Sequence, residues 1–301
     1  MVVTPAGRRR YLSILFPYVV SLHAQGLVDE YRIWVNTTNA RDVDFIDNLA
    51  TNDFVTTEHL PDGVECDSIR SIHHFFKRCT DPDTVYVRFD DDIVMLDTPS
   101  AFEAFVRFRI DNPEPFLVYA NILNNAIMAH IHKRTGTLAL ADFDLTYDCM
   151  ESPAWTNPAC AEALHSEVLA ALANGSLSQF RLPTNPLFGD YERVSINCIS
   201  WLGDDFASFG GEVGEDEEVW LSTVRASETQ RPNCMFGGYV CVHFAFHTQR
   251  EHLENTCDGV HLSAYAELAG VHDWSSLRNP DPTQGAKQQS TKYRRGYAKA
   301  R

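Results

Sequence analysis

The sequence predicts an α/β fold in which a mostly parallel central sheet is flanked by helices. Strand-like and helix-like segments alternate through the first third of the 301-residue chain, as expected for parallel strands joined by helical crossovers. Hydrophobic residues make up 44% and charged residues 22% of the chain, a composition that argues against disordered, collagen-like and coiled-coil proteins. The pattern loosens after the first third, so we expect an irregular second half that shapes a pocket.

The first third is expected to form strands at 1–5 and 31–35 with a helix between them. Apolar residues recur at helical spacing from 12 to 22, and Gly26 follows as a helix C-cap. A second helix is expected at 69–79, because its apolar residues fall on one helical face.

The remaining expected elements extend to the end of the folded body. They are a strand at 84–89, a helix near 101–110, a strand at 116–119, a helix at 159–173, a strand at 194–200, an acidic turn and helix from 211 to 224, and a strand at 239–246. No linker or repeat separates them, so we expect one domain over 1–280, in halves at 1–97 and 98–280.

Charge is distributed unevenly along the chain. The 25 basic and 41 acidic residues give a net charge of −16, which argues against a protein that binds nucleic acid by covering phosphates with Lys and Arg. Between Pro282 and Arg301 the chain has six basic residues and no acid. We expect a flexible, solvated tail at 281–301, and the alternative is peripheral contact with an anionic membrane or another polyanion.

The cysteines and apolar segments indicate the compartment. The eight cysteines form no C-x-x-C pair, which argues against a zinc ribbon or a thioredoxin-like redox site. We find no signal peptide and no run approaching the roughly 20 apolar residues that span a bilayer. We therefore expect free, mostly buried thiols and a cytoplasmic or membrane-peripheral protein without a transmembrane segment.

Three successive carboxylates, Asp90, Asp91 and Asp92, follow the strand expected at 84–89. In an open α/β sheet, ligands bind outside the carboxyl ends of the strands. Side chains two apart on an extended chain point the same way, so Asp90 and Asp92 can share a target while Asp91 faces elsewhere. Adjacent carboxylates repel unless a cation or strong donors compensate, so the segment predicts a divalent metal that carries a diphosphate.

Other interpretations of this acidic segment are a solvated turn with helix-capping acids and two different metal chemistries. A phosphatase of the haloacid dehalogenase type would need Thr where Val94 stands. A calcium loop of the EF-hand type would need a Gly and a closing Glu at offsets that the segment lacks.

The segment VYVRFDDDIVMLD at 85–97 resembles the D-x-D motif of glycosyltransferases of GT-A fold, which use nucleotide sugars. The resemblance extends over about residues 1–265. The matching features, in order, are an N-terminal strand ending at 4–8, a helix at 68–76 before the acidic strand, an acidic cluster at 214–220 and a late histidine-containing strand at 241–247. The resemblance implies a GT-A-like fold, with a nucleotide-sugar-binding half at 1–97 and an acceptor and catalytic half at 98–280.

The resemblance also implies roles for individual residues. Asp90 and Asp92 correspond to the D-x-D pair, with Asp92 a direct ligand of Mn²⁺ or Mg²⁺ and Asp90 touching the ribose or, through water, the metal. Such a metal bridges the two phosphates and neutralises charge on the departing nucleoside diphosphate. The residues expected to line the nucleotide pocket are Thr4, Pro5, Ala6, Gly7, Arg8, Asn36, Thr37, Arg70, Ser71, Asp90 and Asp91.

A second acidic cluster puts five carboxylates between Glu212 and Glu218, just before a helix. Acids at a helix N-terminus are stabilised by unpaired amides and the dipole, so capping alone would explain the cluster. The resemblance implies instead that an E-D pair at this position supplies the base of an inverting reaction. That base is then Asp216, with Glu217 as the alternative, whereas a retaining reaction would not require it.

His243 and His247 are four apart in an expected strand, so they face the same side. A histidine in an apolar strand is ordinarily a satisfied core residue. The resemblance implies instead that a late histidine binds the metal opposite the D-x-D pair, and an imidazole ligand favours Mn²⁺ over Mg²⁺. We name His243 as this ligand and His247 as its substitute.

With this resemblance, the sequence predicts a metal-dependent hexosyl- or pentosyltransferase. The donor would be a UDP- or GDP-linked sugar, and the acceptor a hydroxyl of a glycan or glycoconjugate. One alternative is a metal-dependent nucleotidyltransferase or phosphohydrolase. The other is a non-catalytic carbohydrate-binding protein on the same fold.

Overall fold

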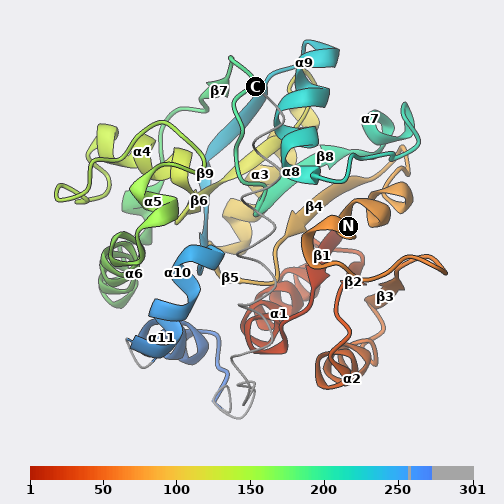
Figure 1. Cartoon of the computed structure of the whole chain (residues 1–301), viewed down its shortest axis with the longest axis horizontal. Coiled ribbons are helices and arrows are strands. Elements are labelled where there is room, and N and C mark those ends of the chain that lie inside the picture. The colour runs from red at the N-terminus through yellow and green to blue at the C-terminus, as the bar shows by residue number, and fades with distance from the viewer. Residues whose placement is uncertain (257–258, 273–301) are drawn as a thin grey trace.

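The computed structural model describes residues 1–256 and 259–272, and these form a central sheet between helices (Figure 1). The sheet has the strand order β3-β2-β1-β4-β8-β6-β9-β5, and β7 pairs with β9. The strands are β1 (Val2–Ala6), β2 (Tyr31–Val35), β3 (Val55–His59), β4 (Val85–Phe89), β5 (Ile93–Leu96), β6 (Val118–Leu123), β7 (Leu187–Phe188), β8 (Cys198–Leu202) and β9 (Asn233–His243). This architecture confirms the predicted α/β fold class.

Six strands of the described sheet run in one direction. Strands β1 to β4 are parallel, β8 runs antiparallel between β4 and β6, and β6 is parallel to β9. Only β5, β7 and β8 run the other way, since β5 and β7 are antiparallel to β9. The sheet is therefore mostly parallel, and the carboxyl ends of β1, β2, β4 and β9 lie at the same edge.

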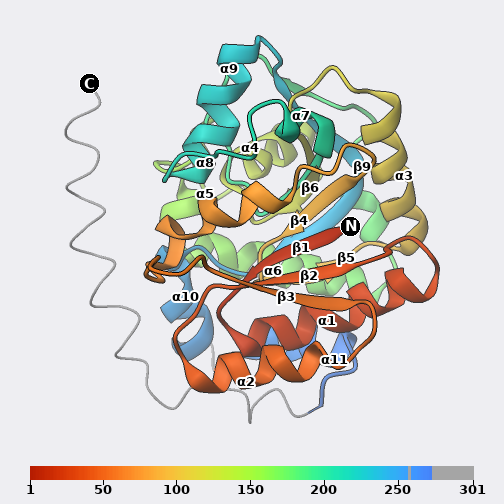
Figure 2. The ribbon, with the colours of Figure 1, turned by 90° about the vertical axis from the view of Figure 1, so that its right-hand side faces the viewer.

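Helices cover both faces of the sheet. In Figure 2, α1 and α2 lie below β1 to β3, whereas α8 and α9 lie above the sheet. The helical segments are α1 (Arg9–Ala24), α2 (Ala40–Leu49), η1 (Ser68–Arg70), η2 (Ile72–Arg78), α3 (Pro99–Asp111), α4 (Ala126–Thr135), α5 (Pro153–Thr156), α6 (Pro158–Ala173), η3 (Leu177–Phe180), α7 (Gly203–Ala207), α8 (Glu217–Val219), η4 (Trp220–Val224), α9 (Arg225–Thr229), α10 (His247–Glu251), η5 (His252–Thr256) and α11 (Val260–Leu268).

Helix α1 forms where the apolar spacing predicts it. The residues that set this spacing, Leu12, Leu15, Val19 and Leu22, are buried in the core. Gly26 then adopts a φ of +71°, a conformation that is favourable for glycine and ends the helix before β2.

The segment at 69–79 forms two short 3₁₀ helices, η1 and η2, rather than one α-helix. Ser71 lies between them, and its Oγ donates to Asn36 Oδ1 at 2.7 Å and accepts from the Asp67 amide at 3.2 Å. Such side-chain bonds compete with helical backbone bonds. They attach this segment to the end of β2.

The elements that were not foreseen from the sequence include α2, β3 and β5. Strand β5 matters most for the site, because it begins directly after the acidic residues. The Ile93 amide donates to the Asp90 carbonyl at 3.1 Å, so the acids form a turn between β4 and β5. Strand β5 then pairs with β9 so that Ile93 lies opposite His243.

The acidic turn and the helix expected over 211–224 are both present, and the helical part begins at Glu217. Gly211 has a φ of +66°, and a Cβ atom there would lie 2.5 Å from the Phe76 carbonyl oxygen, so this segment is a turn packed on η2. Asp216 is the N-cap of α8, and its side chain accepts from the Val219 amide at 3.1 Å. The following turn, η4, is π-helical.

The buried residues form two apolar clusters. One covers strands β1 to β4 with the inner face of α1, and the other lies between α6, α11, β5 and β9. Of the seven cysteines in the described residues, six are buried and none is in a disulfide. No helix in this part of the chain combines the length and apolar character needed to cross a bilayer. The basic tail predicted at 281–301 lies outside the described residues.

Candidate functional site at the carboxyl ends of the strands

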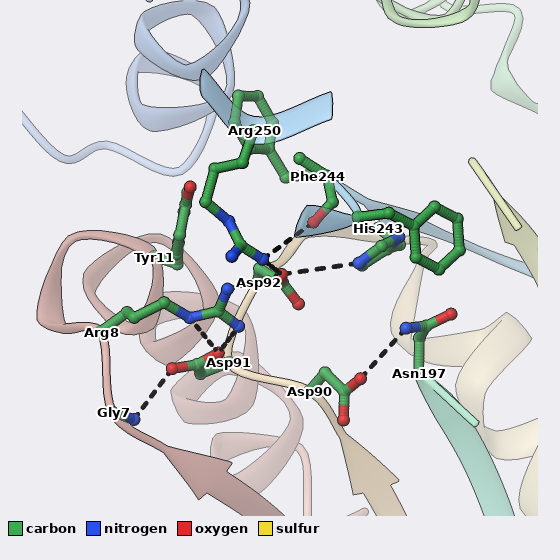
Figure 3. Close-up of polar contacts among 12 residues, drawn as sticks. Gly7, Arg8, Tyr11, Asp90, Asp91, Asp92, Asn197, His243, Phe244 and Arg250 are labelled. Carbon is green, nitrogen blue, oxygen red and sulfur yellow. Dashed lines mark hydrogen bonds and ion pairs between the residues drawn. The ribbon is translucent and has the colours of Figure 1, made fainter. Parts of the chain in front are cut away.

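The middle carboxylate of the acidic turn, Asp91, binds the connection between β1 and α1. Its side chain accepts from the Gly7 amide at 2.9 Å and from Arg8 Nε at 3.0 Å, with a further contact to Arg8 Nη2 (Figure 3). Asp91 is only 3% exposed. Its oxygens are therefore used to hold the ends of β1 and β4 together.

The third carboxylate, Asp92, lies between three nitrogen-bearing side chains. Its Oδ2 is 3.0 Å from Arg8 Nη1, 3.1 Å from Arg250 Nη2 and 3.5 Å from His243 Nε2. Burial alone would raise the pKa of Asp92, but Arg8, His243 and Arg250 outweigh burial and hold this pKa well below its usual range. Asp92 is therefore ionised.

The tautomer of His243 follows from the contact of Nδ1, the ring nitrogen that does not face Asp92. Nδ1 lies 3.0 Å from the carbonyl oxygen of Asn124, which can only accept, so Nδ1 carries a proton. In the neutral ring Nε2 is then an acceptor that faces Asp92. The 3.5 Å separation of Nε2 and Asp92 Oδ2 is favourable only if a proton or another cation lies between these two atoms.

The first carboxylate, Asp90, turns away from this group toward Asn197 (Figure 3). Its Oδ1 accepts from Arg88 Nε at 3.0 Å and Arg88 Nη2 at 2.7 Å, and its Oδ2 accepts from Asn197 Nδ2 at 3.1 Å. Burial raises the pKa of Asp90, and Arg88 opposes that effect. Asp90 is thus fixed by two neighbours beside the Asp92 group.

Of the two acids considered as a base, only Glu217 faces this region. Glu217 is 6% exposed, and its Oε1 lies 3.7 Å from Arg88 Nη2. Burial raises the pKa of Glu217 to about 8, although Arg88 lowers it in part. Asp216 has a side chain that is 54% exposed, caps α8 and lies 3.7 Å from Arg193.

These groups line one cavity of about 310 Å³ at the carboxyl ends of β1, β2, β4 and β9. Three arginines and five carboxylates are among its lining residues. They are Pro5, Gly7, Arg8, Asn36, Ile69, Ile72, Arg88, Asp90, Asp91, Asp92, Ile196, Asn197, Glu217, Glu218, His243, Ala245, Phe246, His247 and Arg250. A separate hollow of about 220 Å³ lies around Met1, Val28 and Val85, away from these groups.

The remaining predicted residues do not line the cavity. Thr4 and Ala6 are buried within β1, and Ser71 is buried behind Asn36. Arg70 is exposed on η1. Thr37 accepts from the Asn39 amide at 3.1 Å, which shapes the start of α2.

The cavity contains side chains of the kind that bind a divalent metal. In residues 1–256 and 259–272, no three His, Cys, Asp or Glu side chains are grouped as a complete ligand set. Asp92 and His243 nevertheless offer an oxygen and a nitrogen that face each other. Mg²⁺ is commonly held by one or two carboxylates together with substrate phosphates, so these residues fit a metal that binds with a phosphate-bearing ligand.

Sequence reasoning missed Arg88, Asn197, Glu218 and Arg250 as cavity residues. Arg88 has a signal in the sequence, since it is a charged residue inside an apolar strand and two positions before Asp90. Arg250 lies 158 positions after Asp92, and only the path from β9 into α10 brings the two together. No local pattern marks that contact.

The structure is that of an α/β protein with a charged cavity at the carboxyl ends of its strands, the position at which open α/β sheets usually bind ligands. In structure the chain is similar to the galactosyltransferase LgtC, solved in complex with donor and acceptor sugar analogues. The two are 10% identical, the match covers 92% of this chain and 100% of LgtC, and the TM-score is 0.43. No protein-family model and no curated protein matches the chain.

Proposed function

We propose that this protein is a glycosyltransferase that uses a nucleoside-diphosphate sugar together with Mn²⁺ or Mg²⁺. The observation that supports this function is the meeting of Asp92, His243, Arg8 and Arg250 with the buried Glu217 in one cavity. Guanidinium groups bind phosphate oxygens, and carboxylates bind the accompanying cation. Because carboxylates outnumber arginines on the wall, a diphosphate would need that cation to enter.

Asp92 and His243 Nε2 are the proposed metal ligands, and Asp90 supports them from its bonds with Arg88 and Asn197. When bound, the metal would neutralise the charge that develops on the departing nucleoside diphosphate. An imidazole ligand favours Mn²⁺ over Mg²⁺. Arg8 and Arg250 both contact Asp92, and their guanidinium groups would donate hydrogen bonds to the phosphate oxygens.

The nucleoside is proposed to lie along Pro5, Gly7 and Asn36. Gly7 belongs at this position because a Cβ atom there would lie 3.0 Å from the Asn36 carbonyl oxygen. The bond from Ser71 orients the Asn36 side chain for the ribose or base. Thr4, Ala6, Thr37 and Arg70 would act through the shape of these loops.

Glu217 is proposed as the base of an inverting reaction, ahead of Asp216. The carboxylate takes the proton of the acceptor hydroxyl while that oxygen bonds to the anomeric carbon and the bond to the diphosphate oxygen breaks. A base whose pKa lies near the working pH is the most effective, and burial raises the pKa of Glu217 to about 8. Asp216 then serves as the helix cap.

A binding measurement followed by a product measurement tests this function. We expect UDP or GDP to raise the melting temperature in the presence of Mn²⁺, and to lose that effect with EDTA or in Asp92→Asn. Asp97→Asn is the matched control, since Asp97 is a buried, arginine-paired carboxylate outside the cavity. Release of inorganic phosphate or pyrophosphate without sugar transfer would refute the proposal in favour of phosphoryl chemistry.

A further inference from the structure

Arg88 is a charged side chain buried in the middle of the site. It belongs to β4, is 3% exposed and lies between the apolar residues Val87 and Phe89. Its guanidinium carbon is 6.0 Å from the centre of the Phe76 ring. Arginine is rarely placed so deeply unless all its donors have partners.

The donors of Arg88 are used unequally. Nε and Nη2 both donate to Asp90 Oδ1, and Nη2 is 3.7 Å from Glu217 Oε1. Nη1 is buried and finds no hydrogen-bond partner in the described part of the chain. An unpaired buried N–H of a charged group is costly, and such groups are uncommon in folded proteins.

Arg88 is one of the residues that line the cavity, so a ligand bound there can come close to its guanidinium group. Arg88 lies between Asp90, beside the proposed metal ligands, and Glu217, the proposed base. In a glycosyl transfer, the group between the diphosphate and the base is the transferred sugar. We propose that Arg88 determines donor specificity by donating its Nη1–H to a hydroxyl oxygen of that sugar, an inference that rests on the proposed function.

The surroundings favour a neutral sugar over one that carries a carboxylate. Asp90 already occupies the Nε and Nη2 edge of the guanidinium, so a carboxylate could pair only with the Nη1 and Nη2 edge, where Nη2 already lies 3.7 Å from Glu217 Oε1. A second negative charge would also lie close to Asp90. A single hydroxyl oxygen satisfies Nη1 without either difficulty.

The test compares each nucleotide sugar with its parent nucleotide. The probes are UDP-glucose, UDP-galactose and UDP-N-acetylglucosamine against UDP, and GDP-mannose against GDP, all with Mn²⁺. Arg88→Lys keeps the charge beside Asp90 but removes Nη1. We expect the ratio of the sugar-nucleotide Kd to the nucleotide Kd to rise by about tenfold or more, because a bond from a charged donor is lost. The nucleotide Kd itself should change less than about twofold.

Arg181→Lys is the matched control. Arg181 donates to Asp97 through Nε at 2.9 Å and Nη2 at 2.7 Å, the same kind of pair, outside the cavity. Its substitution should leave the Kd ratio unchanged. An equal loss of affinity for sugar nucleotide and nucleotide in Arg88→Lys would refute the inference and leave the proposed function standing.

A measurement on the unaltered protein covers the case in which Arg88→Lys does not fold. UDP-glucuronate should bind at least tenfold more weakly than UDP-glucose, and equal or tighter binding of the carboxylate sugar would overturn the inference. If the protein binds UDP and GDP with Mn²⁺ but discriminates among none of these sugars, the Arg88 assignment is wrong. If it binds none of the probes, the proposed function fails and the inference fails with it.

Discussion

Glu217→Gln should make the protein more stable at alkaline pH while abolishing transfer. Burial raises the pKa of Glu217 from its ordinary 4.5 to about 8, so the folded state binds this proton more tightly than the unfolded state does. The stability that the proton provides is complete below pH 4.5 and is lost as the pH rises through 8. Each pH unit in that window changes the free energy of unfolding by about 1.4 kcal/mol, or up to about 5 kcal/mol in all.

Urea unfolding of the wild type and the variant at pH 5, 6, 7 and 8 measures this difference. The variant should gain stability relative to wild type at each step, and parallel pH curves would contradict the assigned burial of the Glu217 carboxyl.

Transfer activity should fall by at least about 100-fold if Glu217 is the base, with nucleotide binding retained. Asp216→Asn is the control, since that side chain is exposed and should change neither the pH slope nor the activity substantially. Full activity in Glu217→Gln would return the role of base to Asp216.

Three further outcomes are expected. Asp92→Asn should remove the Mn²⁺-dependent rise in melting temperature with nucleotide, and Asp97→Asn should not. Burial lowers the pKa of His165 from its ordinary 6.5 to about 3, so the folded state disfavours the protonated ring. The stabilisation that comes from the neutral ring is therefore complete above pH 6.5, and the free energy of unfolding falls by up to about 1.4 kcal/mol per pH unit toward pH 3. In His165→Gln, urea unfolding measured at several pH values should show a smaller fall over that range. Gly26→Ala should lower the free energy of unfolding by about 1 kcal/mol, because φ is +71° there although no neighbouring atom would contact the added Cβ. Gly211→Ala should lower it further, because its Cβ would also clash with the Phe76 carbonyl. Equal urea unfolding midpoints for the two variants would refute this packing.

The parts of the fold that the sequence predicted best are those with a regular apolar pattern and a clear end. Helix α1 and strand β2 were found in this way, as was α6. Strand β5 is four apolar residues with no turn signal except the three acids before it, so nothing in the local pattern separates it from a loop. The 3₁₀ segments η1 and η2 depend on the contact of Ser71 with a residue 35 positions earlier, which no periodicity reports.

The site was predictable where its residues are contiguous or carry a recognisable order. The acidic turn, Gly7, Arg8 and His243, which the sequence singled out, all line the cavity. The choice between Asp216 and Glu217 depends on which residue begins α8 and which way each side chain then points. The preceding glycine turn packs on η2, a segment far away in the sequence, so no local pattern fixes where α8 begins.

The bonds of Asp91 with Gly7 and Arg8 have a consequence for how a ligand meets this site. They join the loop after β1 to the turn after β4, so these two walls of the cavity are hydrogen-bonded to each other. Of the three adjacent acids, Asp91 therefore shapes the cavity, and Asp90 and Asp92 are the two for which we propose roles in binding. Under the proposed function, the spacing between the nucleoside and diphosphate positions would be fixed before a ligand binds, which would reduce the ordering that binding requires.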